Sequence, residues 1–203
     1  MRSLYEISEW VRTEPNPTFR RNKRYFLHAA KAIGRNSTTE EGLLRLMIWV
    51  GTLLPTKEKH SRLQHPLDIL SDGSGWCDQH CAVFNYMAWN LLDIGGRPLA
   101  IYHTDGVNGH TVTEVLYGET WHLFDAHGDH QAVYRHSADR HILSYDEIVA
   151  NPACVIAENH WWRGNNGVGK EGFYIEGSRA CRSYPAVSLT NSMKSPWKSW
   201  LTS

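Results

Sequence analysis

The sequence predicts an α+β domain in which a helix that carries a cysteine packs on an antiparallel sheet, with a helical segment at the N-terminus. Apolar residues recur at helical spacing through the first third of the chain and again after Gly75. From Pro98 onward they occur in short extended runs separated by turn residues. With 203 residues, of which 41% are hydrophobic, the chain can bury one sizeable core, so we expect one domain.

The single domain, residues 1–203, divides into three parts by pattern. Residues 1–62 form a predicted helical scaffold, and residues 63–130 hold the cysteine helix and the strands that follow it. Residues 131–203 are interpreted as C-terminal decoration that could shape a substrate site, because their Gly-, Trp- and Ser-rich tail has weak periodicity.

Two helices are predicted in the N-terminal scaffold. The prolines of "TEPNPT" indicate a turn, after which "FRRNKRYFLHAAKAIG" is helical and ends at Gly34. The next helix, "STTEEGLLRLMIWVGTLLP", opens with a capping-box pattern from Ser37 to Glu40 and ends at Pro55. This part is expected to support the fold.

A third helix is predicted in "GWCDQHCAVFNYMAWNLLDIGG". Its apolar stripe consists of Cys77, Cys81, Phe84, Ala88 and Leu91. The two glycines at its end are a typical C-terminal stop. Cys77 therefore falls in the first turn of this helix.

The strands that follow define a hairpin. The runs "PLAIYHT", "HTVTEVLY" and "TWHLFDAH" are extended, and Gly118–Glu119 has the length of a two-residue hairpin turn. Facing residues then have numbers that sum to 237, which places His110 opposite His127 and Asp125 opposite Val112. A short helix is expected in "LSYDEIVANP".

This pairing brings two polar side chains together. Residues that alternate along paired strands share a face, so His110 and Asp125 lie on one face, on a diagonal of about 7–8 Å. A carboxylate so placed can fix the tautomer of an imidazole and orient it toward a nucleophile. Glu114 shares this face, and either pairs with another residue or lines the site.

Three interpretations of Cys77 compete. Cys77 and Cys81 are four residues apart, which is not the Cys-x-x-Cys spacing of a zinc site, and Cys154 and Cys181 are isolated. A disulfide between cysteines one turn apart on a helix would be strained. A nucleophile is favoured, because the helix N-terminus stabilises a thiolate and its free N–H groups can hold an oxyanion.

The segment from "GSGWCDQHCAVF" through "GHTVTEVLYGETWHLFDAHGD" resembles the core of the transglutaminase-like superfamily, a branch of the papain-like cysteine enzymes. The likeness covers about residues 63–130. It implies a papain-like fold with Cys77 as nucleophile, His110 as general base and acid, and Asp125 as the residue that orients the histidine. It also implies transfer of an acyl group from an amide or ester to the thiol, and then to water or an amine.

The remaining site residues are expected on weaker grounds. Oxyanion stabilisation is assigned to three candidates by proximity in sequence: Trp76, Gln64 and His65. Candidates for lining the substrate are Gly75, Gly109, Glu114, Trp161 and Trp162. No metal and no cofactor are expected.

Charge is unevenly distributed although the net charge is zero. Residues 1–62 carry 12 Lys and Arg against 6 Asp and Glu, residues 63–160 carry 3 against 13, and residues 161–203 carry 6 against 2. The acidic centre is either neutralised by the basic flanks or attracts a cationic amine acceptor. Without net positive charge, nucleic acid is not expected as a partner. The sequence starts with neither a signal nor a membrane anchor, so a cytoplasmic location and free thiols are expected.

The function that these observations predict is acyl transfer through a thioester on Cys77, with hydrolysis of a peptide, other amide or ester favoured over amide formation with an amine. Two other classes stay open. One is a metalloenzyme with His122, His127, Asp129 and His130 as ligands. The other is a module that has the fold but binds without catalysing. The oligomeric state is not predicted.

Overall fold

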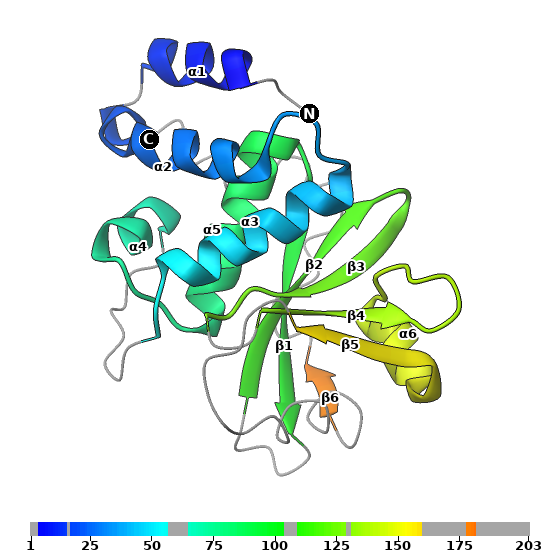
Figure 1. Cartoon of the computed structure of the whole chain (residues 1–203). Coiled ribbons are helices and arrows are strands. Elements are labelled where there is room, and N and C mark those ends of the chain that lie inside the picture. The colour runs from blue at the N-terminus through cyan, green and yellow to red at the C-terminus, as the bar shows by residue number, and fades with distance from the viewer. Residues whose placement is uncertain are drawn as a thin grey trace.

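The computed structural model describes residues 4–15, 17–56, 65–103, 109–128, 131–159 and 178–181. Its helices are α1 (Leu4–Thr13), α2 (Pro17–Ile33), α3 (Thr39–Leu53), α4 (Pro66–Asp72), α5 (Cys77–Leu92) and α6 (Tyr145–Ala150). Its strands are β1 (Gly96–His103), β2 (Gly109–Tyr117), β3 (Thr120–Asp125), β4 (Ala132–His136), β5 (Val155–Asn159) and β6 (Ser178–Cys181). The predicted α+β class is confirmed, with helices first and an antiparallel sheet after them (Figure 1).

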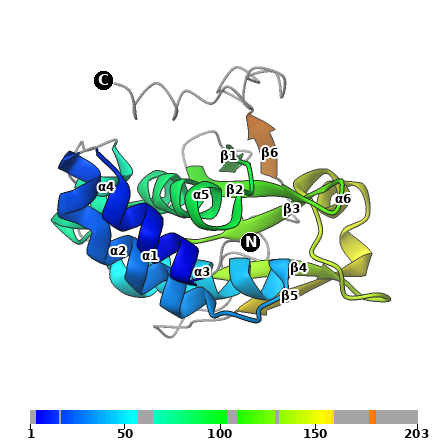
Figure 2. The same ribbon diagram turned by 90° about the horizontal axis from the view of Figure 1, so that it is seen from above.

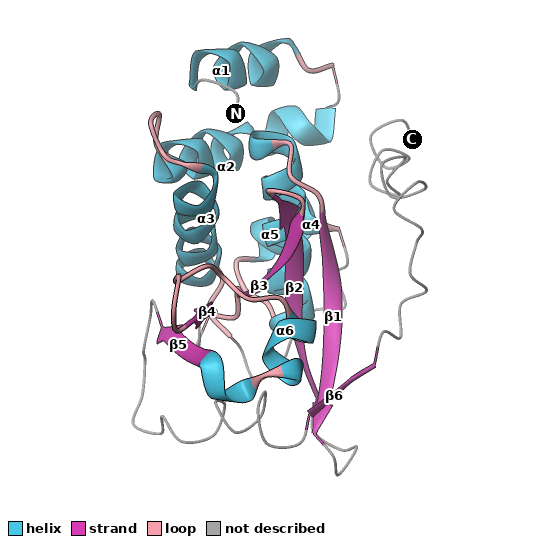
Figure 3. Cartoon of the chain, turned by 90° about the vertical axis from the view of Figure 1, so that its right-hand side faces the viewer, coloured by secondary structure: helices cyan, strands magenta, loops and turns pink. Residues whose placement is uncertain are grey.

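The strands form a sheet in the order β5-β4-β3-β2-β1-β6, and each strand is antiparallel to its neighbours. Helix α5 packs on β1 and β2, and α3 packs on α5. Helices α1 to α4 gather at one side of the molecule, whereas α6 lies at the far side (Figures 2 and 3). The central strands are therefore covered on both faces.

Alternate residues of the central strands enter two different cores. Val115 and Phe124 belong to the core shared with the helices, where Phe124 stacks on Phe84 of α5 with ring centroids 5.6 Å apart. Val112 and Leu123 belong to the second core, on the side of α6. Both faces of these strands are apolar for this reason, which is typical of a sheet buried on both sides.

The β2–β3 hairpin has the predicted register. Thr113 pairs with Phe124 and Tyr117 with Thr120, so paired numbers sum to 237. The turn residues Gly118 and Glu119 both have positive φ, 56° and 70°, as in a type I′ turn, whose twist matches that of the flanking strands. The two-residue turn is confirmed.

Two expectations are corrected by the structure. The capping box of α3 lies one residue later than predicted, from Thr38 to Glu41, because the hydroxyl of Ser37 contacts the carbonyl of Ile33 and the guanidinium of Arg45 instead. The C-terminal part is more than decoration, because it supplies α6 and the strands β4, β5 and β6. The helices α1 and α4 and the strands β4, β5 and β6 were not anticipated.

No helix within the described ranges combines the length and the apolar character needed to cross a bilayer.

The hairpin turn offers a test of the register. Glu119 is exposed and holds φ at 70°, a conformation that costs a non-glycine residue about 1–2 kcal/mol. We expect Glu119→Gly to raise the free energy of unfolding by about 1 kcal/mol, after the entropy of the added glycine is subtracted. Urea denaturation measures the change. Glu119→Ala is the control: it removes the same carboxylate but keeps the strained conformation, so a gain in this variant as large as that of glycine would contradict the explanation.

Candidate active site

Cys77 is the first residue of α5, as predicted. Trp76 precedes it in an extended conformation, with φ −103° and ψ 178°. The N–H of Trp76 donates to the side-chain oxygen of Gln79 at 3.0 Å, which closes the first turn over the backbone. The first N–H groups of a helix have no partner within it and lie at the positive end of the helix dipole. The half-buried thiol of Cys77 therefore lies at a position that favours negative charge.

His80 holds the backbone next to Cys77 in place. Its Nδ1 lies 2.6 Å from the carbonyl oxygen of Trp76, and its Nε2 lies 2.5 Å from that of Leu54 at the end of α3. The ring is fully buried. Each ring nitrogen therefore faces one backbone carbonyl oxygen. Through His80, the loop before the nucleophile is tied to α3.

Gly128 allows this arrangement. A Cβ atom at position 128 would lie 3.0 Å from the carbonyl oxygen of Leu54 and 3.3 Å from Nε2 of His80. A side chain there would therefore compete with the contact between these two groups. The chain after β3 passes against the clamp made by His80 because residue 128 has no side chain.

His110 and Asp125 form a buried hydrogen bond at the other side of the site. Nε2 of His110 lies 2.8 Å from Oδ2 of Asp125, and the two side chains are 7% and 1% exposed. The second carboxylate oxygen accepts from the N–H of His127 at 3.1 Å. With Nε2 directed at the carboxylate, Nδ1 is the ring nitrogen left for the thiol. Asp125 thus fixes both the tautomer and the angle of the imidazole.

The surroundings of the Cys77 thiol favour its ionised form. Burial by itself raises the pKa of this thiol. The hydrogen bond and charge of His110, together with hydrogen bonds from the backbone and side chain of Thr111, outweigh burial and hold the pKa below its ordinary value. A thiolate is the reactive form of cysteine. The site can therefore present a nucleophile near neutral pH.

Cys81 has the opposite character. It is fully buried, and its Sγ donates to the carbonyl oxygen of Thr111 at 3.3 Å. Burial, followed by the negative charges of Asp125 and Cys77, holds the pKa of Cys81 well above its ordinary value. Both Cys77 and Cys81 are free thiols. The interpretation of Cys81 as a core residue is confirmed.

A third imidazole, His127, lies between the two parts of the site. Its ring meets that of His110 edge-on, with centroids 5.6 Å apart, and that of His80 at 5.1 Å. Its Nε2 is 3.2 Å from the hydroxyl of Thr56. Three histidines thus run from the His110–Asp125 pair to the carbonyl before Cys77.

The other predicted site residues have different positions. Trp76 is 40% exposed beside the nucleophile, and Gly75 is buried against Gln79. Gly109 opens β2, next to His110. Gln64, Trp161 and Trp162 lie outside the described residues. The oxyanion role of Trp76 and Gln64 stays a prediction.

His65 has a structural task. It caps α4, where its Nδ1 accepts from the N–H of Leu67 at 3.2 Å, and its ring packs edge-on against Tyr86. Tyr86 is nine residues beyond Cys77 on α5, about 13 Å along the helix axis. These contacts account for His65 without an oxyanion role, which stays a prediction.

Glu114 was a predicted substrate-lining residue, and the structure instead places it in a buried ion pair. Arg97 donates to its Oε2 at 2.9 and 2.7 Å, and the N–H of Tyr145 donates to its Oε1 at 2.9 Å. The side chain is 1% exposed. Glu114 therefore joins β1, β2 and the start of α6, and Arg97 is the partner that the sequence left open.

The residues of the predicted metal site do not form one visible cluster. His122 contacts the carbonyl oxygen of Ile142 and stacks on Tyr117, whereas His127 lies in the row of histidines. Asp129 and His130 lie outside the described residues. In the described ranges, the one group close enough to share an ion involves none of these four residues.

Two contributors to the site, His80 and Thr111, were missed in the sequence, and His127 was considered only as the residue opposite His110 and as a metal ligand. His80 is one of several polar residues in α5, so its place in the helix was a weak signal. Its carbonyl partner on α3 is 26 residues away, which no local pattern indicates.

Solved structures match this chain only distantly in shape. No family model matches this sequence, and comparison with curated proteins finds no match. Among solved structures, LapG of Legionella pneumophila aligns over 100% of this chain and 97% of its own, at 11% identity and a TM-score of 0.44. A TGase aligns over 61% of this chain and 37% of its own, at 12% identity and a TM-score of 0.43. A "Putative Cysteine Protease" from Cytophaga hutchinsonii aligns over 79% of this chain and 58% of its own, at 13% identity and a TM-score of 0.45. These likenesses are distant and carry no conclusion about function.

The ionisation of Cys77 leads to a prediction on its reactivity. We expect alkylation by iodoacetamide to follow a pH midpoint below that of the unfolded chain, since His110 and Thr111 favour the thiolate. In His110→Ala, the hydrogen bonds of Thr111 remain to oppose the rise in the thiol pKa that burial causes, but those of His110 are lost. The pH midpoint should therefore rise. Peptide mapping by mass spectrometry follows each cysteine, and Cys81 should react last.

His136→Ala, which removes a histidine at the end of β4, is the matched control and should leave the midpoint unchanged in metal-free buffer. An equal rise in both variants would show that His110 does not act on the thiol.

The clamp at His80 leads to a prediction on stability. His80→Ala leaves the buried carbonyl oxygen of Leu54 without its imidazole partner, at about 1–3 kcal/mol, whereas the carbonyl of Trp76 keeps the N–H of residue 80 as a donor at 2.8 Å. We expect the free energy of unfolding to fall by about 1–3 kcal/mol, and by less in His80→Gln, whose amide keeps a donor. Urea denaturation tests both variants. If His80→Ala were as stable as the partly exposed control His136→Ala in metal-free buffer, the clamp would not be important for stability.

Proposed function

We propose that this protein is a cysteine-dependent hydrolase that cleaves an amide bond of a peptide through a covalent thioester on Cys77. The observation that supports it is the convergence of Cys77, His110 and Asp125 from α5, β2 and β3, with the 2.8 Å contact inside the pair and the lowered pKa of the thiol. These are the roles of nucleophile, base and orienting group in acyl transfer.

The first half of the reaction forms the thioester. His110 takes the thiol proton on Nδ1, and the sulfur of Cys77 attacks the carbonyl carbon of the substrate. The negative charge that develops on the carbonyl oxygen lies near the N–H groups at the start of α5, which stabilise it. As the C–N bond breaks, His110 gives its proton to the leaving amine. Asp125 stabilises the imidazolium that exists between these two proton transfers.

The second half releases the acyl group. A water molecule attacks the thioester while Nδ1 of His110 accepts its proton, and the S–C bond breaks. The carboxylic acid leaves and the thiol of Cys77 is restored by the proton from His110. The three side chains therefore return to their starting state after one peptide bond has been hydrolysed.

Transfer to an amine is the alternative product of the same thioester. The excess of carboxylates in residues 63–160, 13 against 3 basic residues, favours a cationic primary amine as acceptor. The choice depends on whether amine or water reaches the thioester first, so it can be read from the products.

The test is a screen of peptides, amides and activated esters, with mass spectrometry of the intact protein to detect an acyl group on Cys77. We expect an adduct on Cys77 that decays to free acid, and Asp125→Asn should lower turnover by about 10²–10⁴-fold because the imidazole loses its orientation. Cys77→Ser should abolish the thioester, with Cys154→Ser as a matched control that retains activity. Addition of a diamine should leave the product a free acid; a stable amide product would establish the transferase instead.

A Cys77 that accepts no acyl group from any donor, in protein whose His110-dependent thiol reactivity is intact, would contradict the enzymatic proposal and favour a binding module.

A further inference from the structure

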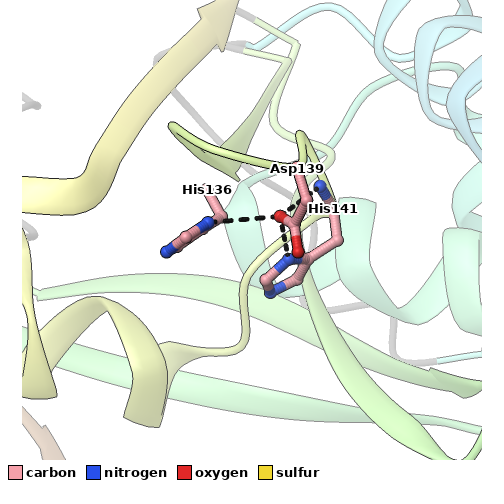
Figure 4. A group of neighbouring side chains, drawn as sticks. All are labelled: His136, Asp139 and His141. Atoms are coloured by element: carbon pink, nitrogen blue, oxygen red, sulfur yellow. Dashed lines mark hydrogen bonds and ion pairs between the residues drawn. The ribbon is translucent and has the colours of Figure 1, made fainter.

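A second group of polar side chains lies at the end of β4, in the turn of residues 136–141. Figure 4 shows two imidazoles directed at one carboxylate. Nδ1 of His136 and Nδ1 of His141 lie 3.2 and 2.6 Å from the same oxygen, Oδ1 of Asp139. The two rings stack, with centroids 5.3 Å apart and an angle of 22°. Three ligand-bearing groups therefore converge on one point.

Backbone hydrogen bonds hold this turn, and two of the side chains add longer contacts, from the N–H of Ala138 to Nδ1 of His136 and from the N–H of His141 to Oδ1 of Asp139, both at 3.4 Å. The N–H of His136 donates to the carbonyl of His141 at 2.9 Å, and the N–H of Arg140 donates to the carbonyl of His136 at 3.0 Å. The N–H of Ser137 donates to the carbonyl of Cys154, which ties the turn to the segment before β5. The positions of the three side chains are thus set in advance.

The ring of His141 is oriented by a second carboxylate. Its Nε2 lies 3.3 Å from Oε1 of Glu147 on α6. With Nε2–H donated to Glu147, the lone pair of His141 is on Nδ1, directed at Asp139. A histidine that ligates through one nitrogen and donates to a carboxylate through the other is the usual arrangement around protein-bound zinc.

We propose that His136, Asp139 and His141 bind one divalent transition-metal ion of the zinc class through two Nδ1 atoms and a carboxylate oxygen. The candidate ligand atoms all lie within 4.8 Å of one another. Ligands on a tetrahedral ion with bonds of about 2.0–2.2 Å are about 3.3 Å apart, so the ion needs only small side-chain shifts. Imidazole with carboxylate suits zinc better than calcium or magnesium, which prefer oxygen ligands alone.

The neighbouring cations do not occupy this point. The guanidinium of Arg140 is directed at Glu158 at 3.5 Å, and Arg135 forms its shorter ion pairs with Glu158 and Glu40. The alternative without an ion is a surface cluster in which Asp139 accepts hydrogen bonds from both histidines, and such exposed contacts contribute little to stability.

The ion would be structural and separate from the acyl-transfer site. Asp125 pairs with Ala132 at the start of β4, and His136 is four residues further, about 13 Å along the strand. An ion at the far end would fix the turn to α6 through the contact between His141 and Glu147. Its binding is therefore independent of the proposed function.

The test is calorimetric titration of the metal-free full-length chain with Zn²⁺, in a Cys77→Ala background that removes the reactive thiol as a competing ligand. We expect one ion to bind, and Asp139→Asn and His141→Gln each to weaken binding more than tenfold, with about tenfold for Glu147→Gln. Asp93→Asn is the matched control: it makes the same change at an exposed carboxylate at the end of α5 and should leave the affinity unchanged. Zn²⁺ should also raise the melting temperature of the parent but not of Asp139→Asn.

Substitution with Co²⁺ identifies the ligands independently. A tetrahedral cobalt spectrum without a thiolate charge-transfer band is expected, and it should disappear in His141→Gln. A thiolate band, or equal Zn²⁺ affinity in Asp93→Asn, Asp139→Asn and His141→Gln, would place the ion elsewhere. Absence of binding would show that the group is a surface ion-pair cluster only.

Discussion

The register of the β2–β3 hairpin is the constraint on which the site depends. Successive side chains of a strand point to opposite faces, so a slip of one residue would turn Asp125 away from His110. The type I′ turn at Gly118–Glu119 and the split of Val115 and Val112 between two cores hold the register in place. One hairpin thereby positions both the base and the group that orients it.

The nucleophile is positioned by a different kind of contact. Helix α5 is anchored to the sheet by apolar packing, and the hydroxyl of Thr113 on β2 lies 2.7 Å from the amide oxygen of Asn85. His80 adds a polar clamp at the N-terminal end of the helix, where Cys77 lies, through the carbonyl groups of Trp76 and Leu54. Buried polar groups are costly without partners, so this clamp specifies one position for the loop before Cys77. The thiol and the imidazole then meet although they come from separate elements.

The sequence was sufficient wherever the deciding interactions are local. The helix that starts at Cys77 follows from a repeating apolar stripe, and the pairing of His110 with Asp125 follows from strand alternation and the length of one turn. Prediction was less successful where a side chain chooses between nearby partners. Ser37 and Thr38 both suit a helix cap, and only the position of Arg45 decides that Ser37 turns elsewhere.

What the sequence alone determined is the set of chemical groups and the faces on which they lie: a cysteine at a helix start, and a histidine and an aspartate on one side of a hairpin. Tertiary structure decided which groups meet. The contact of His80 with Leu54, the pairing of Glu114 with Arg97 and the approach of His110 to Cys77 join residues 17 to 33 positions apart. Periodicity reports only the geometry within one element, whereas these contacts depend on how helices dock on a sheet, which is set by the packing of both cores together.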